Sequence, residues 1–404
     1  MENNKKLKIL CIGDTANNAY MMSKITNKSN LDIINFPRVG SAKNTYSENV
    51  RFFKSYLISK QVDEVNKIKS NYDLCFVSSW EGARVAYLSN LNYVFFFVGG
   101  DVYEQPFIKN AKTKYLKNPI HSKNFFERWL LKKVLENAIV CVTSGGIDFV
   151  KKLKKFHPAV LRMDMFPVGE EFLKKHEPVN KSKKKFTFFS PQRQGLEKGM
   201  DVIWEAINFT STDFEILQVN WFDRRTPEEN EIAERYIKNI PKKIKLIPMI
   251  KWDEMPKFYA WSDAVMGQMR FRHGSIEREA VLCGKPVLHY SDPNEKFLIN
   301  GTEYEASFLP KSKDPKELAK IIDRIVSDDE FRNNLLRKEL EFIKKLTDRE
   351  SIGIFWDELF IELFKKYRKI DKNSSNFKIK ILYLICSIFE ILIYKRKWSY
   401  KLEK

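Results

Sequence analysis

Two cationic residues stand five positions apart in the stretch SPQRQGLEKGM, where Arg193 and Lys198 follow the apolar run FTFFS. A short apolar run bounded by turn residues is typical of a buried strand. We therefore expect both side chains in the loop and first helical turn at the mouth of a sheet. Cations placed there can bracket a diphosphate and neutralise charge on a departing phosphate oxygen. A solvated basic loop is the alternative for this stretch taken alone.

The stretch FRHGSIEREAVLCGKPVLHY, residues 271–290, offers complementary groups. Ser275 is the expected N-cap of a short helix after a glycine loop, and the N-terminus of a helix attracts phosphate. Glu279 lies one turn inside this helix. A carboxylate is unfavourable beside a phosphate, so we expect it to accept hydrogen bonds from sugar or ribose hydroxyls. The backbone groups expected at the phosphates belong to Gly274, Ser275 and Ile276.

The first half of the chain alternates apolar runs with helical patterns. The run LKILCIG, Leu7 to Gly13, ends in a glycine loop, as the first strand of a doubly wound sheet does. Alternating strands and helices imply a parallel sheet with helices on both faces. Further strands are expected at 31–36, 72–79, 93–100 and 138–144.

A charged segment, residues 170–185, interrupts this alternation, and the pattern then restarts. A chain of 404 residues is too long for one ordinary core, so we expect two domains with a cleft between them. Strands of the second domain are expected at 186–190, 214–219, 243–250 and 264–269. The expected divisions are a first domain at 1–168, a linker at 169–185, a second domain at 186–345, a helix that crosses back to the first domain at 346–370, and a basic amphipathic tail at 371–404.

Sites on parallel sheets lie beyond the carboxyl ends of the strands. In the first half of the chain Gly13, Asp101 and Ser144 follow expected strands, and they are candidates for contact with a second substrate. His121, in NPIHSKNFF, is a further candidate for a polar contact. A plain turn is the alternative at the positions that follow strands.

The composition describes a globular protein with an unusual charge. A formal charge of +19 attracts polyanions such as nucleic acid, an anionic membrane surface or phosphate-bearing small molecules. Only this charge favours nucleic acid, because the sequence has no Cys/His finger and no aromatic-plus-glycine RNA motif, and we expect no such partner. The five cysteines lie in apolar runs without C-x-x-C spacing and are expected to be reduced core residues. The N-terminus lacks a signal-peptide pattern, which favours the cytoplasm.

The segment 377–398 is the most hydrophobic part of the chain. It contains Lys378, Lys380 and Glu390, so a transmembrane helix of about 20 apolar residues is not favoured. A helix lying in an anionic membrane surface fits the pattern better, and a helix packed on the first domain is the alternative. The apolar residues at helical steps are Ile379, Leu382, Ile385, Phe389 and Ile393.

The two stretches that hold the cations and the glutamate also carry a resemblance. SPQRQGLEKGMDVIWEAI resembles the strand, arginine, lysine-glycine and helix segment of the retaining GT-B glycosyltransferases of family 4, also called group 1. HGSIEREAVLCGKPVL is similar to their glycine, glutamate-alanine, cysteine-glycine, proline-valine signature. With MIKWDEMPKFYAWSDAVM and ENAIVCVTSGG, the resemblance covers most of residues 7–370, more closely in the second half than in the first.

The resemblance implies a GT-B fold, in which two doubly wound Rossmann-like domains face each other across a cleft. It implies a nucleotide-sugar substrate, transfer with retention, and neither a metal nor a cofactor. Carried over by residue, it implies that Arg193 and Lys198 hold the donor diphosphate and that Glu279 holds the ribose. Gly274 to Ile276 would contribute backbone contacts near the phosphates and the donor sugar.

Two positions depart from the family pattern. Phe271 stands where the family carries a first glutamate facing the donor sugar, and Val98 stands where it often has a histidine. His273 or His121 would then supply a polar contact. The alternative to an enzyme is an inactive GT-B-like, membrane-associated scaffold that binds sugar nucleotides.

The apolar, basic tail and the positive net charge favour an acceptor that is located at a membrane. We expect a lipid-linked or cell-envelope glycan as acceptor, bound by the first domain. We also expect the chain to be a cytoplasmic protein that attaches peripherally to the inner face of the plasma membrane.

Overall fold

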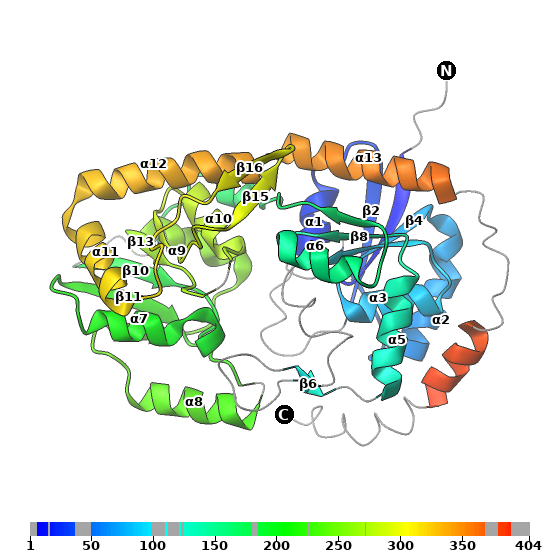
Figure 1. Ribbon diagram of the computed structural model, residues 1–404, viewed down its shortest axis with the longest axis horizontal. Coiled ribbons are helices and arrows are strands. Elements are labelled where there is room, and N and C mark those ends of the chain that lie inside the picture. Colours follow the sequence, from blue (N-terminus) through cyan, green and yellow to red (C-terminus); the bar gives the residue numbers. More distant parts are fainter. Residues whose placement is uncertain are drawn as a thin grey trace. The chain divides into compact units, whose positions relative to one another are not determined.

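The computed structural model describes residues 6–14, 17–36, 50–97, 110–111, 121–122, 125–179, 185–224, 226–270, 272–367 and 379–388. The chain divides into two compact units. Unit 1 comprises Met1–Lys109, Lys123–Asp164 and Arg349–Lys404, and unit 2 comprises Asn110–Ser122 and Met165–Asp348. Figure 1 labels their elements, and each unit is described by itself.

Unit 1 is built on a seven-stranded sheet with the order β3-β2-β1-β4-β5-β8-β9. All of its neighbouring strands pair in parallel, as the alternating pattern predicts. The two edge strands, β3 and β9, have three residues each and were not predicted. The strands are β1 (Leu7–Ile12), β2 (Ser29–Asn35), β3 (Val50–Phe52), β4 (Leu74–Val77), β5 (Tyr93–Phe97), β8 (Val140–Thr143) and β9 (Val160–Arg162).

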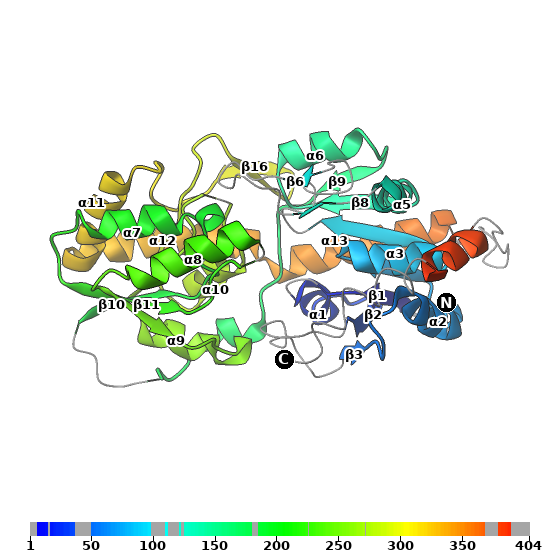
Figure 2. The same cartoon turned by 90° about the horizontal axis from the view of Figure 1, so that it is seen from below.

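Helices cover both faces of this sheet (Figure 2). One face packs against α2 (Ile58–Ile68), α3 (Trp80–Leu88), α5 (Phe125–Glu136) and α6 (Ile147–Lys154) in one hydrophobic cluster. The other face meets α13 (Arg349–Tyr367), whose Trp356 ring lies 5.4 Å from the rings of both Phe76 and Phe96. Asp357 of α13 accepts backbone hydrogen bonds of 2.7 and 2.8 Å at the turn after α1 (Asn18–Ser23).

Unit 2 has a five-stranded sheet with the order β12-β11-β10-β13-β14, again parallel throughout. The chain adds β11 and β12 on one side of β10 and then returns to add β13 and β14 on the other. The strand order therefore reverses between β10 and β13, and ligands of such sheets bind at this switch point. The strands are β10 (Phe186–Ser190), β11 (Phe214–Val219), β12 (Ile244–Ile247), β13 (Ala264–Met266) and β14 (Val287–Leu288).

The helices of unit 2 also form two layers. A hydrophobic cluster joins one face of the sheet to α7 (Met200–Ile207), α8 (Pro227–Lys238) and α11 (Pro315–Ser327). On the other face, the ring of Phe189 in β10 stacks 5.5 Å from Phe258 of α9 (Met255–Trp261). The helix α10 (Ser275–Leu282) contacts α9 and α12 (Asp329–Leu346). A β-hairpin of β15 (Lys296–Ile299) and β16 (Thr302–Glu305) completes the unit.

Part of the segment expected to be a linker belongs to the core of unit 2. The short 3-10 helix Glu170–Leu173 contacts α10, and Phe172 within it is fully buried. The Phe172 ring lies 4.7 Å from that of Trp252 and 6.1 Å from that of Tyr259. The charged neighbours of Phe172 suggested an exposed linker, but this one buried aromatic side chain holds the stretch in the core.

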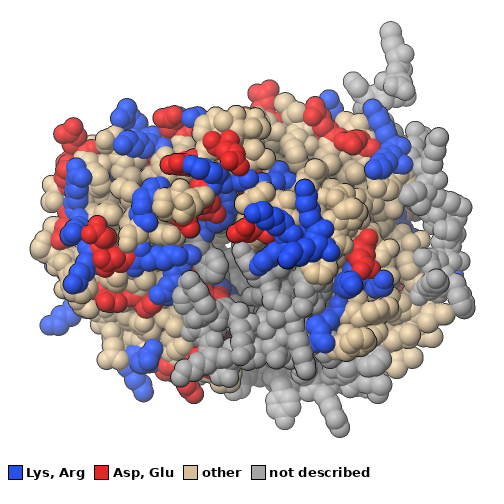
Figure 3. All heavy atoms as spheres, in the orientation of Figure 1, with Lys and Arg blue, Asp and Glu red and all other residues tan. Residues whose placement is uncertain are grey.

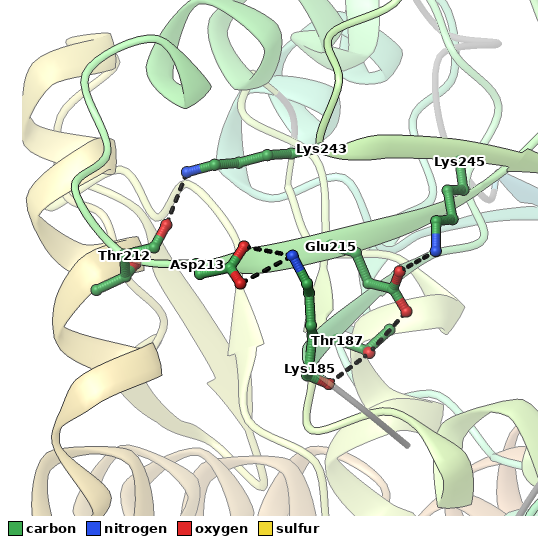
Figure 4. A network of polar contacts seen from close by, with 7 residues as sticks. All are labelled: Lys185, Thr187, Thr212, Asp213, Glu215, Lys243 and Lys245. Carbon is green, nitrogen blue, oxygen red and sulfur yellow. Dashed lines mark hydrogen bonds and ion pairs between the residues drawn. The ribbon is translucent and has the colours of Figure 1, made fainter. Parts of the chain in front are cut away.

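The amino ends of β10, β11 and β12 carry lysine–carboxylate pairs (Figure 4). Lys185 lies 2.8 Å from Asp213, and Lys245 pairs with Glu215. Lys243 donates to the backbone carbonyl of Thr212 at 2.7 Å. These contacts join neighbouring strands at the edge of the sheet opposite to the switch-point loops.

Residues 379–388 form a helix that packs on unit 1 through one of its faces. Leu382 is buried, and Tyr383 donates a hydrogen bond of 2.9 Å to Asp63 of α2. Within the described ranges no helix combines the length and the apolar character that crossing a bilayer requires. For this face, the structure therefore agrees with the expected alternative of a helix packed on the first domain. Phe389 and Ile393 lie outside the described residues.

Candidate active site

The candidate site of unit 2 is formed by the two loops that leave β10 and β13 at the switch point. The loops are joined where Met269 donates its backbone N–H to the carbonyl of Lys198 at 2.8 Å. Gly199 has φ of 79°, and a Cβ there would lie 2.7 Å from the Met269 side chain. Glycine is therefore needed for this close approach, which holds Lys198 against the second loop.

Lys198 is half-buried, and its ammonium group donates a hydrogen bond of 2.7 Å to the amide oxygen of Gln268. Burial lowers the pKa of Lys198, and the positive charge of Arg193 lowers it further. The two predicted cations therefore lie close enough, at the carboxyl end of the sheet, for the charge of one to affect the pKa of the other.

Arg193 is held by a carboxylate from the neighbouring strand. Its Nε lies 2.6 Å from Oδ1 of Asp223, which follows β11 and is almost buried. A Cβ at Gly195 would lie 2.0 Å from the same carboxylate, so glycine allows Asp223 to reach the loop. Sequence reasoning missed Asp223, because its role depends on β11 lying beside β10.

Gln268 was also missed, because the apolar pattern predicts a strand at 264–269. The strand β13 ends at Met266 instead. After it, the Gln268 N–H points to Oε1 of Glu277 at 3.3 Å, while its side chain turns to Lys198. Because the strand ends at Met266, Gln268 lies in the loop, where its neutral amide accepts a hydrogen bond from Lys198.

The helix α10 begins at Ser275 as predicted, but its N-cap is Gly274 and not Ser275. The Gly274 N–H donates to Oε2 of Glu277 at 2.6 Å, and Oε1 of Glu277 lies 3.1 Å from Nδ1 of His289. Burial would raise the pKa of Glu277, but His289 and the Gly274 N–H together hold it well below its usual range. A fully buried carboxylate thus fixes the loop in which Gly274 to Ile276 were expected to meet phosphates.

Glu279 faces another side of α10. It is buried, and it accepts hydrogen bonds of 3.3 Å from Nε1 of Trp252 and from the hydroxyl of Tyr259. Burial raises the pKa of Glu279 to about 7. The α10 glutamate whose charge acts on Lys198 is Glu277. No contact that the structure describes joins Glu279 directly to the two cations. The expectation that all three side chains converge on one ligand stays a prediction.

His273 occupies an aromatic cluster. Its ring centroid lies 4.7 Å from that of Phe297 and 5.4 Å from that of Phe308. Burial, followed by the charge of Arg278, lowers the pKa of His273 well below its usual value. The ring is therefore neutral at physiological pH and packs as an aromatic group. Phe271 lies outside the described residues.

The candidates in the first half of the chain are separated along the sheet of unit 1. Gly13 has φ of 77° and follows β1, and its carbonyl accepts a hydrogen bond of 3.0 Å from Ser78 after β4. Ser144 follows β8 and donates to the Phe97 carbonyl at 3.3 Å. Because β4 and β5 lie between β1 and β8, Gly13 and Ser144 are about 14 Å apart across the strands. Asp101 and the side chain of His121 lie outside the described residues.

A hollow with an empty volume of about 300 Å³ adjoins the cation loop of unit 2. Gly195, Leu196 and Met200 line one side of it, and Asp223 and Glu229 line the other. Neither Lys198 nor Glu279 borders this hollow. Within the described ranges, no group of three or more His, Cys, Asp or Glu side chains is arranged to hold a metal ion.

Residues 171–339 match the family described as glycosyl transferases group 1, while no curated protein matches the sequence. Several solved structures are similar over most of the chain. HepE from Anabaena, in complex with UDP and glucose, has a TM-score of 0.63 at 16% identity and covers 88% of this chain and 100% of its own. The sucrose-phosphate synthase of Thermosynechococcus elongatus has a TM-score of 0.61 at 16% identity, with coverage of 89% and 100%.

The fold is GT-B. A glycosyltransferase from Rickettsia africae agrees, with a TM-score of 0.56 at 16% identity over 91% of this chain and 100% of that one. The expectation of a GT-B fold with two Rossmann-like domains is thereby confirmed. The family match begins at the 3-10 helix that carries Phe172 and ends in α12, so it spans both switch-point loops of unit 2.

Proposed function

We propose that the protein is a glycosyltransferase that moves a sugar from a nucleotide-sugar donor, bound by unit 2, to an acceptor hydroxyl. One observation carries this proposal. The segment that matches the group 1 family holds Arg193, Lys198 and the start of α10 around the switch point of one parallel sheet. Ligands of doubly wound sheets bind at such points.

The cations supply the chemistry that the transfer requires. When the bond between the sugar and the diphosphate breaks, negative charge develops on the departing phosphate oxygen. Lys198 and Arg193 would stabilise that charge in a half-buried setting, where a charge–charge interaction is stronger than in water. The anomeric carbon then forms its bond to the acceptor oxygen, and the acceptor proton passes to the departing phosphate oxygen of the nucleoside diphosphate.

Glu279 is proposed to hold the ribose, as the resemblance implies. Its two hydrogen bonds of 3.3 Å are long for O–H···O and N–H···O contacts. An ionised carboxylate has about four acceptor positions, so ribose hydroxyls would bind Glu279 beside Trp252 and Tyr259. Retention at the anomeric carbon, metal independence and the absence of a cofactor belong to the same proposal, because they come with the resemblance to family 4.

We further propose a lipid-linked or cell-envelope glycan as acceptor and a peripheral location at the cytoplasmic face of the plasma membrane. The formal charge of +19 supports this location. Lysines gather over α6 of unit 1 (Figure 3), namely Lys151, Lys152 and Lys154.

The experiment that tests the proposal is a thermal-shift panel of uridine, guanosine and adenosine diphosphate sugars. A ligand that binds the native state raises its apparent stability, and the uridine compounds come first because HepE was crystallised with UDP. We expect the shift to disappear in Lys198→Ala and to persist in Lys245→Ala, a control at the opposite edge of the same sheet. A panel without any shift would contradict the proposal.

The second candidate is an inactive scaffold that binds sugar nucleotides at the membrane. The phenylalanine at position 271, where the family has a glutamate facing the donor sugar, favours it. Measuring nucleotide-sugar consumption with added membrane extract separates the two. An enzyme consumes the donor and releases the nucleoside diphosphate, whereas a scaffold gives the thermal shift without consumption.

A further inference from the structure

The helix at 379–388 is apolar on two faces, and only one of them is used for packing. On the inner face Leu382 is buried against unit 1, together with the partly buried Cys386, and Ile379 is buried as well. Tyr383 fastens this face to α2 through Asp63 at 2.9 Å and the Ser59 carbonyl at 3.4 Å. The helix is therefore oriented by specific contacts, so its opposite face has a defined direction.

The outer face carries a row of exposed aliphatic side chains. Leu384 is 59% exposed and Ile388 is 49% exposed. Residues three and four apart lie on one side of a helix, so these side chains form a continuous strip. Contiguous exposed apolar surface of this kind marks interaction sites. The outer row comprises Ile381, Leu384, Ile385 and Ile388.

The helix carries one exposed lysine, and the neighbouring helix α5 has exposed aromatic rings. Lys380 is the only charged residue of the helix and is exposed. Lys133 of α5 and Cys386 of the helix both lie close enough to Tyr87 of α3 to shift its pKa. The helix and α5 therefore lie over the same face of the unit 1 sheet, as Figures 1 and 2 show. On α5, Phe125 is 77% and Trp129 38% exposed.

We propose that the outer row docks unit 1 on an anionic lipid surface, with the helix lying in the plane of the headgroups. Insertion of aliphatic side chains supplies apolar burial, and Lys380 together with the net charge of +19 adds attraction to anionic lipids. The sequence led us to expect Ile379 and Leu382 on the face of the helix that binds the membrane. Both side chains are buried in the protein, so the proposed membrane face is a different one. The proposal rests on the membrane location proposed above and identifies the surface responsible.

A lipid surface fits the outer row better than a second copy of the chain does. Stable protein dimers bury about 1,200–2,000 Å² in total, and four partly exposed aliphatic side chains on about two helical turns provide much less. Two copies meeting here would also bring together two chains of charge +19, which repel each other. A bilayer needs only a short apolar strip with cations beside it.

The test is co-sedimentation of the full chain with vesicles, without donor or acceptor. Vesicles of phosphatidylcholine are compared with vesicles of an equal mixture of phosphatidylcholine and phosphatidylglycerol. We expect binding to the anionic vesicles that weakens at high salt, since the electrostatic part is screened. The triple variant Ile381→Ser, Leu384→Ser, Ile388→Ser should bind at least about 30-fold more weakly.

The control is the triple variant Val179→Ser, Phe209→Ser, Ile354→Ser, which removes side chains of similar exposure elsewhere and should bind as the wild type does. Equal binding by the outer-row variant, with an unchanged urea midpoint, would overturn the proposal. A change from dimer to monomer in light scattering, with vesicle binding intact, would also overturn it. Because no sugar nucleotide is present, neither outcome depends on the transferase activity.

Discussion

Lysines lie at both edges of the unit 2 sheet, but their partners and surroundings differ. At the amino edge, Lys185 and Lys245 are at least half exposed and pair with Asp213 and Glu215 (Figure 4). At the carboxyl edge, Lys198 is half-buried beside the neutral amide of Gln268. Exposed ion pairs contribute roughly 0–1 kcal/mol to stability, whereas burial makes a charge costly and strengthens its interactions.

This difference suggests that the lysines at the amino edge stabilise the sheet, whereas Lys198 at the carboxyl edge is placed to bind a ligand. At the amino edge Lys185 and Lys245 are each paired with a carboxylate of the protein itself. At the carboxyl edge, burial and the charge of Arg193 lower the pKa of Lys198, and the nearby carboxylates raise it only in part. An anion arriving there would further stabilise the charged lysine. The comparison therefore predicts large effects of substitutions at one edge and small effects at the other.

The largest expected effect is on stability and comes from Glu277. The variant Glu277→Ala leaves His289 and the Gly274 N–H without their carboxylate. Loss of one partner in a buried pair costs about 3–5 kcal/mol. The matched variant Glu215→Ala, at the amino edge, should cost less than about 1 kcal/mol. Urea denaturation measures both, and equal losses would contradict the difference between the edges.

Glu279 gives a pH-dependent effect of similar size. Burial raises its pKa to about 7 from an ordinary value of 4.5, so between these pH values the folded protein binds more protons than the unfolded chain. The contribution of Glu279 to the free energy of unfolding is therefore full below pH 4.5 and is lost as the pH rises to about 7.

The variant Glu279→Gln removes this dependence. It should match the wild type near pH 4.5 and exceed its free energy of unfolding by up to about 3 kcal/mol at pH 8. Urea denaturation at the two pH values tests the sign as well as the size. A difference between wild type and variant that does not change with pH would show that the carboxyl group does not titrate in this range.

Lys198 is the direct test of the carboxyl edge in catalysis. We expect Lys198→Ala to lower turnover of a nucleotide sugar at least about tenfold, because leaving-group stabilisation is lost. The matched variant Lys245→Ala should change turnover less than about twofold, since it removes an exposed pair far from the switch point. Turnover that is unchanged in a folded Lys198→Ala protein would count against the proposed role.

The sequence was sufficient to predict the elements that local patterns encode. Buried parallel strands are continuous apolar runs, so β1, β4, β5, β8 and β10 were recognised. The helix start at Ser275 follows from its glycine loop. Edge strands of three residues, such as β3 and β9, carry too few residues to show a pattern.

The missed site residues depend on relations between distant segments. Asp223 reaches Arg193 only because β11 lies beside β10, and strand order is not encoded locally. Gln268 was assigned to a strand because apolar neighbours surround it. Glu277 stands at the capping-box position only when Gly274 is the N-cap, whereas counting from the expected N-cap Ser275 leads to Arg278. The choice between Glu277 and Glu279 requires the direction of each side chain, which only the packed helix shows.

The smallest expected effect comes from a variant that gives Lys198, at the carboxyl edge, a carboxylate partner like those of the lysines at the amino edge. The variant Gln268→Glu places a carboxylate where the amide oxygen accepts from Lys198 at 2.7 Å, so the lysine gains an internal anion and the donor diphosphate meets a like charge. We expect the Kd for the nucleoside diphosphate to rise about three- to tenfold in calorimetry. Gln268→Leu loses the same hydrogen bond without adding charge and should weaken binding less than about twofold. If both variants weaken binding equally, the hydrogen bond and not the charge controls the ligand, and the two edges differ in geometry alone.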